Sequence, residues 1–107
     1  MANTYTNAKV DLTTTNVTTL YTCATSTTGI VKSILVSEDS GNADTITVTL
    51  TTAASAVFSL FKTKSVGANA TVELLTEPLV VQTGEILKVT AATADRLHVV
   101  ASILEIT

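Results

Sequence analysis

The chain has 107 residues, of which 46% are hydrophobic and only 14% are charged, and its formal net charge is −3. This length makes one domain that can bury a core without covalent staples, and a single cysteine with a single histidine excludes a disulfide scaffold and a zinc module. Six basic residues scattered along an acidic chain leave no electrostatic footprint for a nucleic acid, so we expect no such partner.

Threonine dominates the composition with 23 residues, and valine and isoleucine add to the β-branched total. Such side chains lose rotamer freedom in a helix and pack well on a pleated sheet. The clearest strand covers residues 45–51, where Ile46, Val48 and Leu50 alternate with threonines. We therefore predict an all-β chain without a long helix.

The predicted strands are short and evenly spaced. In chain order they are residues 4–11, 17–23, 29–37, 45–51, 56–63, 70–75, 79–81 continuing into 85–91, and 96–106. Pro78 lacks an N–H group and is expected to open an edge segment, and Gly84 is the expected positive-φ residue of a tight hairpin turn. Seven to eight strands at this spacing predict a single-domain antiparallel β-sandwich of jelly-roll type over residues 1–107.

We expect neither a secretion signal nor a membrane-spanning segment in this sequence. The first five residues have no basic stretch and no apolar run, so we expect no signal peptide. The uncharged stretch of residues 12–31 is too rich in Thr, Ser and Asn to span a bilayer, so we expect no membrane partner.

Two predicted strands, residues 30–36 and 97–106, carry apolar side chains in both alternating sets. In a two-layer sandwich one set faces the core and the other has nothing of its own to pack on. The outward set supplies the candidate interface residues, which are Val31, Leu35, Val100, Leu104 and Ile106. Because a contiguous exposed apolar patch marks a contact surface, we expect a homo-oligomer and favour a trimer.

Cys23 and His98 are the only thiol and the only imidazole in the chain. A nucleophile and its base need a third group that orients the base, and the sequence supplies no such arrangement. We expect Cys23 to be a small buried apolar residue and His98 to face the surface. The carboxylates are isolated and there is no glycine-rich phosphate loop, so we predict no catalytic residues, no cofactor, no small-molecule substrate and no enzymatic activity.

The loop of residues 38–44 concentrates the hard oxygen ligands that a calcium site uses. It lacks the D-x-[DN]-x-[DN]-G pattern and the later bidentate Glu of a helix–loop–helix site. The same Asp, Ser, Gly and Asn residues equally serve the geometry of a polar hairpin. The sequence leaves both interpretations of this loop open, and we assign no metal ligand.

Three segments, residues 30–41, 73–89 and 97–106, resemble small β-rich virion structural proteins of tailed bacteriophages, notably those of marine and cyanobacterial phages. The most characteristic run joins Pro78-Leu79 to Gly84-Glu85 and Leu87-Lys88-Val89, and the resemblance extends from about Tyr5 onward. It implies a non-enzymatic particle component that decorates or cements the capsid, in contact with the major capsid protein or other virion proteins. It also implies a final location in the virion after synthesis in the bacterial host cytoplasm.

Two other roles are weighed against capsid decoration. The first is a structural role in the neck or tail of the same particle. The second is a small ligand-binding sandwich, for example a carbohydrate-binding module, which needs an aromatic platform. The aromatics are Tyr5, Tyr21, Phe58 and Phe61, and we expect the two phenylalanines in the core. The 17 uncharged residues 45–61 instead suit protein–protein packing, because charges are depleted from interface cores.

Overall fold

The computed structural model describes residues 2–107, and over these residues the chain forms nine strands and no helix. The strands are β1 (Asn3–Asp11), β2 (Thr18–Thr22), β3 (Thr28–Glu38), β4 (Asp44–Thr51), β5 (Val57–Val66), β6 (Thr71–Glu73), β7 (Leu79–Val81), β8 (Ile86–Ala91) and β9 (Leu97–Ile106). The predicted strands are found within a few residues of their expected positions. The count exceeds seven to eight because residues 79–91 form two separate strands.

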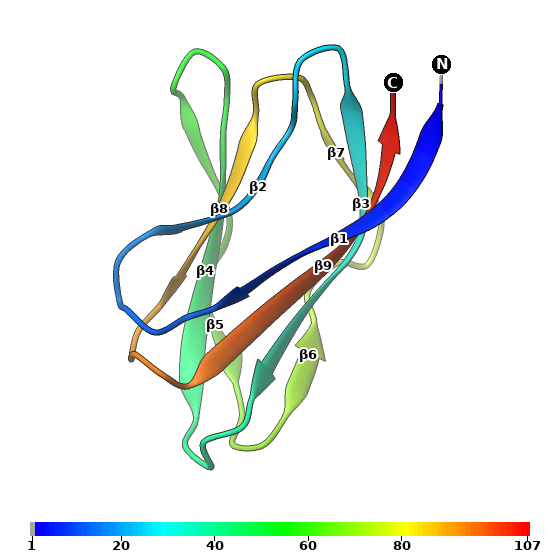
Figure 1. Cartoon of the computed structure of the whole chain (residues 1–107). Coiled ribbons are helices and arrows are strands. Elements are labelled where there is room, and N and C mark those ends of the chain that lie inside the picture. The colour runs from blue at the N-terminus through cyan, green and yellow to red at the C-terminus, as the bar shows by residue number, and fades with distance from the viewer. Residues whose placement is uncertain (1) are drawn as a thin grey trace.

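The strands form two antiparallel sheets that pack face to face (Figure 1). The first sheet has the order β1-β9-β3-β6, with β7 also pairing β3, and the second has the order β2-β8-β4-β5. All neighbouring strands in both sheets are antiparallel. The predicted all-β class and the two-sheet sandwich are confirmed.

Most connections pass from one sheet to the other, the exceptions being β4–β5 and β6–β7. Between β7 and β8, Gly84 has a φ of 82°, and the Glu85 amide donates a 3.0 Å hydrogen bond to the Gln82 carbonyl. The predicted positive φ is therefore confirmed, but the predicted hairpin is wrong. The turn carries the chain from the edge of the first sheet into the second, since residues 82–85 suffice to cross the ~10 Å between packed sheets.

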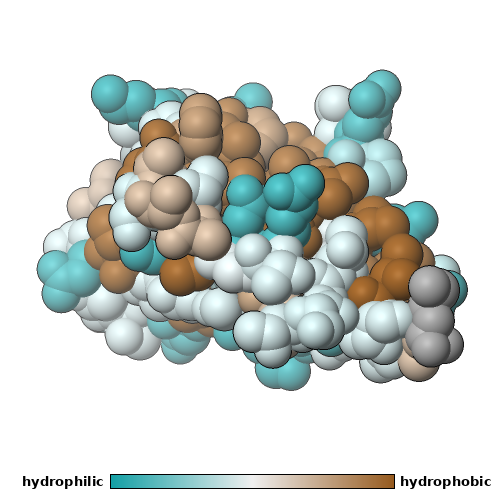
Figure 2. Space-filling model, turned by 90° about the horizontal axis from the view of Figure 1, so that it is seen from above, coloured by the Kyte–Doolittle hydropathy of each residue, from teal (hydrophilic) through white to brown (hydrophobic). Residues whose placement is uncertain are grey.

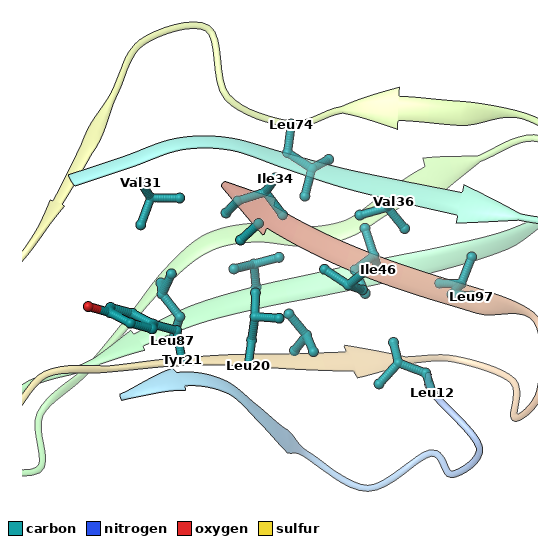
Figure 3. Packing of buried hydrophobic residues seen from close by; sticks show 14 of the residues in the cluster. Leu12, Leu20, Tyr21, Val31, Ile34, Val36, Ile46, Leu74, Leu87 and Leu97 are labelled. Atoms are coloured by element: carbon teal, nitrogen blue, oxygen red, sulfur yellow. The ribbon is translucent and has the colours of Figure 1, made fainter. Parts of the chain in front are cut away.

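The core fills the space between the sheets (Figure 3). Ile34 and Leu97 from the first sheet and Ile46 and Leu87 from the second are all fully buried. On β4 the buried Ile46 and Val48 alternate with half-buried threonines, as the period-2 pattern predicts, but at the end of the strand Leu50 is half-buried and Thr51 is buried. Burial of each such Leu or Ile side chain contributes about 1.5–3 kcal/mol.

Register shifts occur in the β2–β8, β3–β9 and β4–β5 pairs, and the first two change which side chains face the core. In β2 the register shifts between Thr19 and Tyr21, so that Leu20 and Tyr21 both face the core. In β3 the pairing passes from Val31 with Ile103 directly to Ser33 with Ser102, which leaves Lys32 as an extra residue. An extra residue reverses the face of every side chain on one side of it.

Strand β5 forms one edge of the second sheet and contacts only β4 through its backbone. Its first residues continue from the β4–β5 loop, which projects away from the first sheet (Figure 1). Val57 and Phe58 are 62% and 56% exposed, so the expectation that Phe58 lies in the core is wrong. Phe61, farther along the strand, packs partly against the core.

Candidate functional site

The five-stranded sheet turns one face to the core and the other, which we call the outer face, to solvent. Strand register arranges the outer face in rows that cross the sheet. One row is apolar on all four strands that it crosses. Tyr5 on β1 lies beside Leu104 on β9, Leu104 lies beside Ile30 on β3, and Ile30 lies beside Val80 on β7. Tyr5 is 76% exposed and Val80 51% exposed, whereas Leu104 and Ile30 are half-buried.

A second row of the outer face is apolar in its middle and charged at its two ends. It runs from Lys9 to Val100, Leu35 and Glu73. Val100 and Leu35 are 38% and 40% exposed, in the middle of a sheet that offers them no cover. The two rows place exposed apolar side chains on one face of the sheet, and exposed apolar surface of this kind marks protein contacts.

Small polar side chains separate these two rows. Ser102 lies between Asn7 on β1 and Ser33 on β3. A shallow groove of about 630 Å³ crosses the outer face here, and its walls include Asn7, Ser102, Tyr5 and the bulged Lys32. The outer face is therefore low in its middle row and higher on both sides.

The candidate interface residues Leu35, Val100, Leu104 and Ile106 occupy the outer face, as their alternation predicts. Val31 does not: it is fully buried, so its assignment to the outward set is wrong. The cause is the bulge at Lys32, because the extra residue brings Val31 and Ile34 to the same, inward side. Whether the four remaining residues form an interface stays a prediction.

Sequence reasoning missed three members of the outer face, namely Tyr5, Ile30 and Val80. Ile30 has the opposite parity to Leu35 in the sequence and shares its face only because of the bulge. Tyr5 and Val80 join the row through pairings with strands far away in the chain. Figure 2, which views the molecule from above, shows hydrophobic patches beside pale residues of intermediate hydropathy and a few hydrophilic ones.

His98 lies at one end of the outer face between two exposed carboxylates. Its Nε2 is 3.2 Å from an Asp11 oxygen and its Nδ1 is 3.6 Å from an Asp39 oxygen. Ser37 is opposite His98 in the register, but both imidazole nitrogens already face a carboxylate. The two carboxylates lie on different nitrogens of one ring, so the cluster cannot chelate one metal ion through that ring, and His98 is not placed to activate Ser37.

Cys23 and His98 lie at different ends of the sandwich. Cys23 is 1% exposed, and its Sγ donates a hydrogen bond to the Thr27 carbonyl. Tyr21 beside it contacts Glu105, which is seven residues, or about 23 Å, from His98 along β9. The two residues therefore form no dyad, and the expected burial of Cys23 and surface position of His98 are confirmed.

Glu38 organises the loop that the sequence marks as a possible cation site. Its carboxylate accepts hydrogen bonds from the amides of Ser40 at 2.8 Å, Gly41 at 3.1 Å and Asn69 at 3.0 Å, and from the Ser40 hydroxyl. Burial acts to raise the pKa of this carboxyl, but these hydrogen bonds outweigh burial and lower the pKa of Glu38 to about 2. Glu38 thus ties the β3–β4 loop to the turn before β6.

Asp44 ends the same loop at the start of β4, and its carboxylate also accepts a hydrogen bond from a backbone amide. It is buried, and its Oδ2 accepts a 3.1 Å hydrogen bond from the Thr93 amide. Within residues 2–107 no group of three or more His, Cys, Asp or Glu side chains is placed to hold a metal ion. The loop connects two sheets rather than forming a hairpin. Glu38 binds the backbone of the loop, Asp44 binds the Thr93 amide, and Asp39 faces His98.

Tyr21 and Glu105 join the two sheets at the other end of the sandwich. The Tyr21 hydroxyl donates a 2.7 Å hydrogen bond to Glu105 Oε2. Burial, and then the hydrogen bond to the Glu105 carboxylate, raise the pKa of the Tyr21 phenol well above its ordinary value.

The exposed aromatics Tyr5 and Phe58 lie on different sheets, so the described residues offer no shared aromatic platform for a sugar.

No protein-family model matches the chain, and no curated protein matches its sequence. Within residues 2–107 the structure contains no helix with the length and apolar character needed to cross a membrane. The outer face therefore stands as the candidate functional site on its own geometry.

Proposed function

We propose that the chain is a structural protein of a tailed-bacteriophage virion that decorates or cements the capsid. The observation that carries this proposal is the outer face, on which Tyr5, Val80, Leu35 and Val100 hold apolar surface in solvent on a rigid sheet. Such a surface serves contacts between proteins. The resemblance of residues 30–41, 73–89 and 97–106 to virion structural proteins supplies the kind of assembly.

The connectivity of the sandwich supports the same assignment. In each sheet a strand from the end of the chain lies between two strands from its first half: β9 lies between β1 and β3, and β8 lies between β2 and β4. We infer that this is a jelly roll, two Greek keys wound together, in which β6 and β7 share one edge as an interrupted strand.

The outer side of the four-stranded sheet offers a second surface for the shell, in which threonine hydroxyls are mixed with Lys88 of β8 and with the exposed Lys62 and Lys64 of β5. Thr47 and Thr49 on β4 alternate with core residues and lie beside Thr90 and Lys88 on β8. Uncharged hydroxyls cost less to desolvate than charges do, and charged residues are depleted from interface cores. Retention through the hydroxyls should depend only weakly on salt, whereas retention through the three lysines should fall as the salt concentration rises.

The test is the presence and copy number of the protein in virions of the phage that encodes it. Particles are banded in a density gradient, and the chain is quantified by mass spectrometry against the major capsid protein. Hundreds of copies per particle support the decoration role. About a dozen copies overturn it in favour of the neck or tail, and abundance in the lysate with absence from the particles overturns the virion role altogether.

A further inference from the structure

We infer that the outer face is covered by the outer face of a second copy, related by a two-fold axis that lies in the interface and runs parallel to β9. The inference goes beyond the proposed function, since the dimer needs no shell and forms in a solution of the pure protein. It replaces the trimer expected from the sequence. A face that packs on itself closes after two copies.

The arrangement of the rows carries this inference. The outer face has four columns, in the order β1, β9, β3 and the edge shared by β6 and β7. Rotation about an axis parallel to the strands, placed between β9 and β3, exchanges the two middle columns and keeps each row. Leu104 then faces Ile30 of the second copy, and Val100 faces Leu35 of the second copy. These four apolar residues of the middle columns therefore meet one another, whereas Ile106 faces Thr28 of the second copy.

The two outer columns are complementary under the same rotation. Tyr5 faces Val80 of the second copy, and Lys9 faces Glu73 of the second copy. The Glu73 Oε2 atom also accepts hydrogen bonds from two amides of its own chain, at 2.8 and 3.1 Å. An exposed ion pair contributes little affinity, but it selects orientation. A two-fold axis perpendicular to the strands would instead set Glu73 against Val80, with no opposite charge. Charge complementarity therefore selects the axis parallel to β9.

The middle row leaves a gap between the copies, because the two grooves face each other, and it contains one unfavourable group. Ser102 faces Ser33 of the second copy, and both are small. The bulged Lys32 lies beside Ser33 near the axis, so the two copies of Lys32 are one strand spacing apart across the axis and ~10 Å apart between the facing sheets. Like charges at this distance oppose association. Removal of Lys32's charge should therefore strengthen the dimer.

The size of the outer face is compatible with a weak but specific dimer. Four columns and the ten residues of β9 span about 19 by 30 Å, which is about 600 Å² per copy and about 1,200 Å² in total. That total is at the lower end of the range for stable interfaces. We expect a dissociation constant in the micromolar range.

The first experiment is sedimentation equilibrium of the pure chain over a concentration series that spans the micromolar range. The expected mass rises from 11.1 kDa to about 22 kDa, twice the mass of the chain. Leu35→Asp and Leu104→Asp should each raise the dissociation constant at least about tenfold. Lys32→Ala should lower it. Val57→Asp, a matched control at a 62% exposed apolar residue of the other sheet, should leave it unchanged.

The second experiment fixes the axis with a short bis-maleimide cross-linker. The Tyr5→Cys/Val80→Cys double variant should give a covalent dimer, because the two positions face each other across ~10 Å between copies. Tyr5→Cys alone should give none, since the rotation separates the two copies of that residue by three strand spacings. Cys23 is 1% exposed and does not compete for the reagent.

A mass of 11.1 kDa at every concentration overturns the inference, as does a mass near 33 kDa. A dimer that Leu35→Asp and Leu104→Asp leave intact, with native circular dichroism spectra for both variants, also overturns it. So does equal cross-linking of the single and double variants. If a monomer binds virions through these residues, the outer face belongs to the shell protein, so the dimer fails while the proposed function stands.

Discussion

The hydroxyl of Tyr21 on β2 donates a hydrogen bond of 2.7 Å to the carboxylate of Glu105 on β9, and this bond joins the two sheets of the sandwich. Gly29 is the partner of Glu105 in the neighbouring strand β3. A Cβ atom at Gly29 would lie 2.7 Å from the Tyr21 oxygen and 3.0 Å from the ring. The tyrosine therefore requires glycine at this position, although Gly29 lies within a strand.

Gly29→Ala should destabilise the protein by about 1–3 kcal/mol, the usual cost of overpacking a core. The loss runs against the general effect, because Ala in a strand is otherwise favoured over Gly by about 0.5–1 kcal/mol. Urea denaturation followed by circular dichroism measures the change. The matched control is Gly67→Ala, where a Cβ meets only Ala70 at 3.7 Å, and there the free energy of unfolding should hold or rise.

A double-mutant cycle assigns the cost at Gly29 to Tyr21. Tyr21→Phe removes the closest atom and the hydrogen bond to Glu105, at a cost of about 1 kcal/mol. Gly29→Ala should then cost less in the Phe background than in the parent, by at least about 0.5 kcal/mol. Additive losses would show that the clash lies elsewhere.

The Tyr21 phenol should stay protonated at a pH where a free tyrosine ionises. Burial and the Glu105 carboxylate raise its pKa above the ordinary 10.0. A pKa that is raised in the folded state contributes stability that is complete below pH 10.0 and is lost as the pH rises above it. In a Tyr5→Phe background, phenolate absorbance should therefore appear only together with unfolding. Phenolate formation in a chain with a native circular dichroism spectrum would contradict this.

Glu38 should make the protein sensitive to acid in a defined range. Its pKa is lowered from 4.5 to about 2, so its contribution to stability is complete above pH 4.5 and is lost as the pH falls toward 2. Glu38→Gln should lower the melting temperature at neutral pH and flatten its decline between these two values. Glu77→Gln, at an exposed residue of the β6–β7 connection, is the control and should keep the decline of the parent.

Deletion of Lys32 should be tolerated, although it removes a residue from the middle of a strand. The residues on either side already have consecutive partners, Ile103 for Val31 and Ser102 for Ser33. The deletion therefore restores regular alternation and should cost no more than about 1–2 kcal/mol. Deletion of Leu35 should prevent folding, because it turns Val36 or Ile34 out of the core. Thermal melts measure the stability of both deletion variants. An equal loss of stability in the two would contradict the assignment of Lys32 as the extra residue of a bulge.

The sequence by itself determined where the strands lie and that the chain is a β-sandwich. The reason is that side-chain alternation and β-branched composition are local properties, written along each segment such as Ile46–Leu50. Turn chemistry is equally local, so the positive φ of Gly84 and the edge position after Pro78 were predictable. Four of the five candidate interface residues follow from the same alternation.

Only the tertiary structure decided which faces and residues meet. The bulge at Lys32 moved Val31 into the core, and the same bulge brought Ile30 to the side of Leu35. The row from Tyr5 to Val80 depends on pairings among four strands, and Tyr21 finds Glu105 at a separation of 84 residues. Register between distant strands is set by the packing of the whole core, since a shift of one residue exchanges buried and exposed faces along an entire strand.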